Sequence, residues 1–146
     1  MFINTLMSLF GVLRLGVYRR LFESVKDREG SLSATEAFSV DIIHLLGEPT
    51  LSQFAATLNM SQPSATYKIN SLTSKGYVTK SISEQDRREL RIHTTEKFDK
   101  YFTEAYGLQS AMDKLEREYS PAELETAEKV LRSFMEAVKE DKWIYT

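Results

Sequence analysis

Residues 50–94 read TLSQFAATLNMSQPSATYKINSLTSKGYVTKSISEQDRRELRIHT and change their hydrophobic period halfway. In the first half, apolar residues recur every three or four positions in two short segments, which is the spacing of amphipathic helices. Between these segments Asn59 tolerates the left-handed conformation of a sharp turn, Ser61 can cap the next helix, and Gly76 can end it. Two helices joined by a tight turn are typical of a helix-turn-helix.

The second half of this stretch predicts a β-hairpin. Residues 77–82 (YVTKSI) and 90–94 (LRIHT) are rich in residues that favour strands, and their side chains alternate between two faces. The polar segment 83–89 joins them. A hairpin that directly follows a helix-turn-helix forms a wing, and this wing has a charged tip.

Helix-start signals flank this stretch. In a capping box, a Ser or Thr side chain pairs with an acidic or amide residue three positions on. Three predicted helix starts carry such a box, at Ser33–Glu36, Thr50–Gln53 and Ser120–Glu123. Polar breaks at 27–31 and 47–49 separate the early helices, and helical spacing returns over 95–119 and again after Pro121.

The sequence therefore predicts a mainly α fold with one small β-hairpin wing, formed by a single domain over residues 1–146. We expect a winged helix-turn-helix lobe at about residues 33–95, with further helices at about 1–28 and 96–146. Of the 146 residues, 42% are hydrophobic and 27% charged, which is enough apolar material for one core.

The apolar N-terminal segment MFINTLMSLFGVL could pass for a targeting or membrane segment. No positive charge precedes it, however, and Arg14 interrupts it well short of the roughly 20 residues that span a bilayer. We therefore interpret it as the start of an amphipathic helix in a cytoplasmic protein that does not enter a membrane.

The net charge of −2 gives no hint of a nucleic-acid partner, but the charge is unevenly distributed. Residues 59–94 carry six basic and three acidic side chains, whereas both flanking regions are acidic. Because binding to phosphates depends on the local surface, this basic region can bind DNA. The absence of cysteine excludes disulfides and thiol chemistry within the chain.

The second helix of the motif carries short polar side chains opposite its apolar face. A major groove admits one helix, whose hydroxyl and amide groups can reach base edges. We expect Gln62, Ser64, Tyr67 and Asn70 to read bases, Ser61, Thr66, Ser71 and Lys75 to contact the DNA backbone, and Pro63 to lie on the same face. The alternative is a solvated helix surface.

At the hairpin tip, Asp86-Arg87-Arg88 places two guanidinium groups beside one carboxylate. Asp86 can hold one arginine while the other extends, and a narrow minor groove attracts such an arginine. The alternative is a solvated, charged turn without a partner.

These residues resemble the winged helix-turn-helix of the multiple-antibiotic-resistance regulator (MarR) family of bacterial transcription factors. The resemblance rests on Phe54-Ala55, Leu58 to Ser61, Leu72, Lys75 to Tyr77 and above all Asp86-Arg87-Arg88. It implies a homodimer that binds double-stranded DNA at a palindromic operator, usually as a repressor. It further implies that each recognition helix enters a major groove and that Arg88, braced by Asp86, reaches a minor groove.

The apolar stripes near both ends of the chain predict the dimer interface, because they exceed what a small winged domain can cover. We expect the interface to contain Phe2, Leu6, Leu9, Phe10 and Leu13 with Leu131, Phe134, Val138 and Trp143. Packing within one chain is the alternative for some of them.

Members of the resembled family often respond to small aromatic compounds bound between the dimerisation helices and the DNA-binding lobe. The aromatic and polar candidates for such a ligand site are Tyr18, Phe38, His44 and Tyr106. No spacing distinguishes them from ordinary core residues.

Three other functions were weighed against DNA binding. The two histidines belong to no catalytic signature, so we predict no enzyme and no cofactor. A metal-responsive regulator would need more ligands than the pairs Asp41/His44, with Glu36 nearby, and His93/Glu96 supply, so we expect no metal. A helix-turn-helix that contacts only proteins stays open as an alternative.

Overall fold

A computed structural model describes residues 1–24, 31–103 and 108–140. The chain divides into two compact units, Met1–Ala105 and Tyr106–Thr146, and each is described by itself. No helix in the described ranges is both long enough and apolar enough to cross a membrane.

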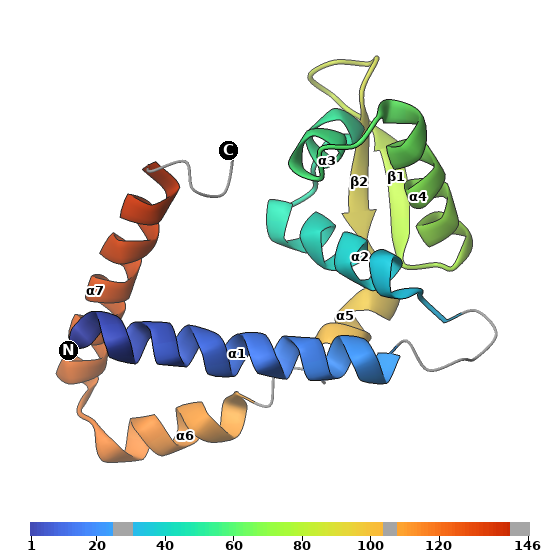
Figure 1. The fold of residues 1–146 in the computed structure, drawn as a ribbon. Helices are drawn as coiled ribbons and strands as arrows, with labels where there is room; N and C mark the ends of the chain where they lie inside the picture. The colour runs from blue at the N-terminus through green and yellow to red at the C-terminus, as the bar shows by residue number, and fades with distance from the viewer. Residues whose placement is uncertain (25–30, 104–107, 141–146) are drawn as a thin grey trace. The chain divides into compact units, whose positions relative to one another are not determined.

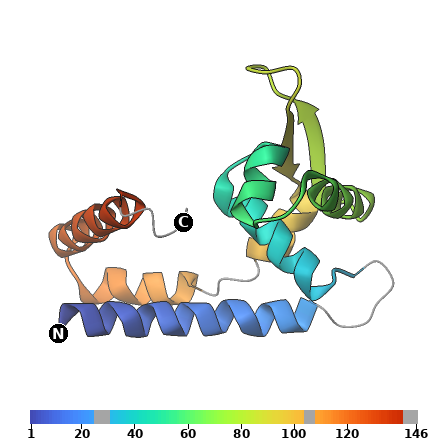
Figure 2. The ribbon, with the colours of Figure 1, turned by 45° about the horizontal axis from the view of Figure 1, so that its top comes forward.

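The first unit contains the predicted winged helix-turn-helix. Its elements are α1 (Phe2–Ser24), α2 (Ala34–Leu46), α3 (Leu51–Thr57), α4 (Gln62–Ser74), β1 (Val78–Ile82), β2 (Leu90–Thr94) and α5 (Glu96–Thr103) (Figure 1). The strands form an antiparallel hairpin whose register runs from Val78↔Thr94 to Ile82↔Leu90. Its loop projects beyond the helices around it (Figure 2). The prediction of a mainly helical fold with one hairpin wing is confirmed.

The helix boundaries follow the capping signals. At the start of α2, the Ser33 hydroxyl accepts a bond from the Glu36 N–H, and the Glu36 carboxylate accepts one from the Ser33 N–H. Thr50 and Gln53 do the same for α3. Asn59 has a φ of 48°, which gives the turn its left-handed residue. The motif geometry is therefore encoded locally.

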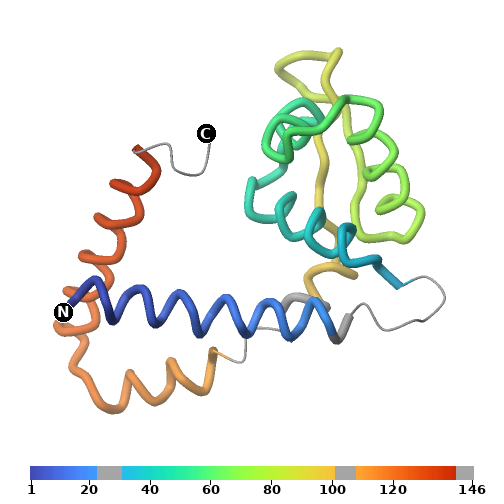
Figure 3. Tube along the Cα trace, in the orientation of Figure 1, coloured from blue at the N-terminus to red at the C-terminus, as the bar shows by residue number. Residues whose placement is uncertain are grey.

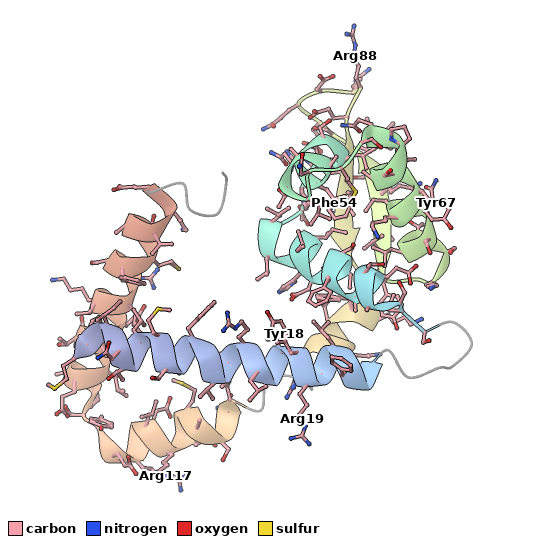
Figure 4. The ribbon with its side chains drawn as sticks, viewed as in Figure 1. Tyr18, Arg19, Phe54, Tyr67, Arg88 and Arg117 are labelled. Atoms are coloured by element: carbon pink, nitrogen blue, oxygen red, sulfur yellow. The ribbon has the colours of Figure 1, made fainter. Side chains whose placement is uncertain are left out.

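The core of this unit lies between the helices and the hairpin. Phe54, Leu72 and Ile92 are fully buried, and Figure 4 shows the Phe54 side chain inside the lobe. Phe98 of α5 is also fully buried and belongs to the same cluster. The core therefore extends past the predicted boundary near residue 95, because the helix after the wing packs back onto it.

In the second unit, residues 108–140 form the helices α6 (Gln109–Glu118) and α7 (Pro121–Glu140), which the tube in Figure 3 traces. The helical pattern over 95–119 is thus shared between α5 and α6, and residues 104–107 lie outside the described residues. At the start of α7, the Glu123 carboxylate accepts from the Ser120 N–H at 2.8 Å, as its capping box predicts.

Candidate nucleic-acid interface

The recognition helix α4 begins at the predicted cap. The Ser61 hydroxyl oxygen accepts a bond from the Ser64 N–H at 3.3 Å and donates to the Ser64 hydroxyl at 2.9 Å. Both serines are exposed, and Pro63 lies in the first turn. The two hydroxyls therefore hold each other at the helix start while facing solvent.

One face of α4 is buried and the other is open. Ala65, Ile69 and Leu72 are buried in the core. The exposed residues include most of the expected DNA contacts, namely Ser61, Gln62, Pro63, Ser64, Thr66, Tyr67 and Asn70. Tyr67 is 77% exposed and points away from the lobe (Figure 4). A large aromatic side chain so exposed suits contact with a partner.

Gln62 and Asn70 are both anchored by neighbouring elements. The Gln62 amide nitrogen donates to the Ser52 hydroxyl of α3 at 3.3 Å. The Asn70 amide oxygen accepts a bond from Lys80 Nζ, on β1, at 2.8 Å. Sequence reasoning missed Lys80, because only the packing of the wing against α4 brings these positions together.

Ser71 and Lys75, two of the expected DNA-backbone contacts, form bonds within the protein. The Ser71 hydroxyl and Lys75 Nζ both donate to the carboxylate of Glu36 in α2, with the Lys75 to Glu36 distance at 2.7 Å. Lys75 Nζ also donates to the Ser31 carbonyl. This network ties the end of α4 to the start of α2, so it positions the recognition helix.

Glu36 is 8% exposed, which makes its charge costly unless partners compensate it. Burial raises the pKa of Glu36, but the bonds from Lys75, Ser71 and Ser33 outweigh it and lower the pKa to about 2 from an ordinary value of 4.5. The carboxylate is therefore ionised in the folded protein over all ordinary conditions.

Replacing Glu36 with glutamine should lower the free energy of unfolding by about 2 kcal/mol at pH 7. The lowered pKa of the folded state stabilises the protein fully above pH 4.5, and this contribution is lost as the pH falls from 4.5 toward 2. Urea unfolding at pH 7 and pH 3 should therefore show the difference between wild type and Glu36→Gln shrink with acid. Exposed Glu84→Gln is the matched control, and a difference that is independent of pH would contradict the assignment.

The wing tip keeps both arginines exposed. Asp86 Oδ1 accepts a bond from the backbone N–H of Arg88 at 2.9 Å, and the Asp86 carbonyl accepts from the Glu89 N–H. Asp86 thus braces the backbone of Arg88 and not a guanidinium. The Arg88 side chain extends from the tip (Figure 4), and within the described residues neither Arg87 nor Arg88 forms an ion pair.

The base of the wing is fastened to the turn before α3. Arg91 Nη1 donates to the Glu48 carbonyl at 3.0 Å, and the Ile92 N–H donates to the Pro49 carbonyl. His93 Nδ1 lies 3.0 Å from the Glu48 carboxylate, and its Nε2 lies 2.6 Å from the Ser81 hydroxyl. These bonds fix the direction in which the wing projects.

Three of the five candidate metal ligands, Glu36, His44 and His93, contact other side chains. Glu36 binds Lys75, His93 binds Glu48 and Ser81, and the His44 ring packs on Phe98 with centroids 5.1 Å apart. Asp41 is partly buried, which raises the pKa of its carboxyl although the nearby His44 charge acts to lower it. The described residues contain no group of three or more metal-ligating side chains.

Two of the aromatic candidates for the ligand site form a ring pair. Tyr18 of α1 and Phe38 of α2 form an edge-to-face pair with ring centroids 6.5 Å apart, and both are exposed. The His44 ring packs against Phe98. Tyr106 lies outside the described residues.

Most of the described side chains that we expect at the dimer interface are exposed apolar residues, in both units. On α1, Phe2, Leu9, Phe10 and Leu13 are exposed and Leu6 is half-buried. On α7, Leu131 and Phe134 are exposed and Val138 is half-buried. Trp143 lies outside the described residues.

This geometry defines a winged helix-turn-helix protein, and comparisons with known proteins agree. The model of the MarR family matches residues 32–90, which span the winged helix-turn-helix of this chain. Members of that family are transcription regulators and not enzymes.

Similar proteins support the same fold. YkoM of Bacillus subtilis (strain 168), an uncharacterized HTH-type transcriptional regulator, is 24% identical over 98 residues, which cover 63% of this chain and 64% of YkoM. FabT of Streptococcus pneumoniae, solved in complex with DNA, has a TM-score of 0.56 and 21% identity over 96% of this chain and 99% of FabT. A MepR mutant of S. aureus has a TM-score of 0.63 and 15% identity over 94% and 97%.

Proposed function

We propose that this MarR-type DNA-binding regulator is a cytoplasmic homodimeric repressor of a palindromic operator. The proposal rests on the observation that a single lobe presents two exposed features suited to DNA binding. The polar face of α4, centred on Tyr67, is open to solvent, and the wing presents Arg87 and Arg88 at its tip (Figure 4).

The two features suit two grooves of one DNA half-site. A helix fits the major groove, where polar side chains reach base edges, and an arginine on a thin loop fits a narrow minor groove. The bonds from Glu36 to α4 and from Glu48 to the wing support this use, because they hold both elements in fixed directions. Because α4 and the wing are already held in place, less conformational entropy is lost when they bind DNA.

Two arguments support a dimer: the need for selectivity between DNA sequences, and the exposed apolar surface. One lobe contacts too little DNA to be selective, whereas a two-fold dimer reads half-sites about 34 Å apart. The exposed side chains of Phe2, Leu9 and Phe10 on α1 and Phe134 on α7 supply apolar surface for a second copy.

Release by a small aromatic ligand forms part of the proposal. The exposed edge-to-face pair of Tyr18 and Phe38 joins α1 to α2, and α2 carries the Glu36 that anchors the recognition helix. A ligand at this pair would act only if it bound one arrangement of these helices better than the other.

The test is selection of bound sequences from random duplex DNA, followed by mobility shift at two salt concentrations. We expect a palindromic consensus and an affinity that falls steeply with salt, with a logarithmic slope of about −0.9 per phosphate contacted. Absence of any duplex binding would overturn the proposal and favour a helix-turn-helix that contacts only proteins. Binding that required added Zn²⁺ would favour a metal-responsive regulator.

A further inference from the structure

We propose that Asn70 and Lys80 form one hydrogen-bond-donor unit that reads a guanine in the major groove. The inference rests on the proposed function, because it assumes that α4 enters that groove. It assigns a specificity-determining role to Lys80, a residue of β1 outside the recognition helix.

The chemistry of the pair fixes the orientation of the Asn70 amide. A lysine ammonium has three donors and no acceptor, so the atom that it approaches must be the amide oxygen. That oxygen lies 2.8 Å from Lys80 Nζ. The amide nitrogen of Asn70, with its two donors, is therefore turned away from Lys80.

This orientation works against the usual reading of adenine by asparagine. That reading needs the amide oxygen to accept from adenine N6 while the amide nitrogen donates to N7. In this chain one of the two lone pairs of the amide oxygen already accepts from Lys80, and the Lys80 ammonium adds donors beside the donor N6 of adenine. The Asn70 nitrogen and the remaining Lys80 hydrogens together offer donors only, and guanine alone presents two adjacent acceptors, O6 and N7, in the major groove.

The position of the pair is suited to this role. Asn70 and Lys80 are both exposed, and Asn70 lies one turn after Tyr67 on the open face of α4. The two side chains line a small hollow together with Leu51, Thr66, Ile69, Leu90 and Ile92. Apart from the Thr66 hydroxyl, these neighbouring side chains are apolar.

The experiment is selection from random duplex DNA with the full chain and four variants. Wild type and Lys80→Arg should enrich guanine at one position of each half-site. Lys80→Met frees the amide oxygen, so guanine should lose about tenfold in relative affinity there and adenine should gain. Asn70→Asp should shift that position toward cytosine or adenine, whose amino groups can donate to a carboxylate. Lys100→Met, at an exposed position of α5, is the control for loss of one charge and should keep guanine.

The outcomes separate this inference from the proposed function. A palindromic consensus that stays the same in Lys80→Met and Asn70→Asp would overturn the inference alone, since the pair would then read no base. A wild-type chain that selects no sequence would overturn the proposed function and this inference with it. Thermal unfolding of each variant checks that a changed consensus does not come from an unfolded lobe.

Discussion

Replacing Phe10 with glutamate should dissociate the dimer and reduce operator binding more than about a hundredfold. Phe10 is 46% exposed on α1, within the apolar surface that we assign to the second copy. A charge buried in such an interface costs several kcal/mol, and two-fold symmetry places it there twice. Light scattering at micromolar concentration and mobility shift on the selected operator measure the two effects.

This substitution should leave helix α1 itself intact. In wild type the Arg14 guanidinium lies over the Phe10 ring, 5.2 Å from its centroid. A glutamate at position 10 can pair with Arg14 one turn later, which favours the helix. Ser8→Glu adds the same charge at an exposed polar position of α1 and should remain dimeric. If the Phe10→Glu variant remained dimeric and bound the operator normally, the assignment of α1 to the dimer interface would be wrong.

Arg88→Ala should weaken operator binding about tenfold for each half-site, and so about a hundredfold for the dimer. A charge-assisted hydrogen bond contributes about 1.5–3 kcal/mol, and each tenfold change corresponds to about 1.4 kcal/mol. The extended Arg88 side chain, with its backbone held by Asp86, is the group best placed to reach a minor groove. Mobility shift should also show a salt slope that is less steep by about two contacts per dimer.

Arg117→Ala on α6 removes the same charge from an exposed position in the other unit and should leave binding unchanged. Asp86→Ala should weaken binding less than Arg88→Ala, since it removes only the brace on the Arg88 backbone. If Arg88→Ala bound the operator with wild-type affinity and slope, the wing would have no role in the minor groove.

Local signals predicted the elements of the lobe well. The caps at Ser33 and Thr50, the left-handed Asn59 and the buried face of α4 all follow from residues within a few positions of one another. The exposure of Tyr67 follows from helical periodicity, and that of Arg88 from its place in the polar hairpin loop. Such features depend on hydrogen bonds and spacing within one turn, which a sequence shows directly.

Contacts between elements were not predictable in the same way. Ser71 and Lys75 fit the pattern of exposed polar residues, but Glu36, more than thirty positions earlier, draws both into the protein. Phe98 lies past the predicted boundary of the lobe but is fully buried in its core. No local pattern in the sequence indicates these contacts, because only folding brings the distant segments together.

The sequence by itself determined the winged helix-turn-helix and the side chains that its recognition helix and wing can present. The tertiary structure alone decided which of those side chains remain available and how they are oriented. Lys80 orients the amide of Asn70, and Glu36 accepts a bond from Lys75. The physical reason is that helix caps and periodicity are local, whereas donor and acceptor pairing depends on which elements pack side by side.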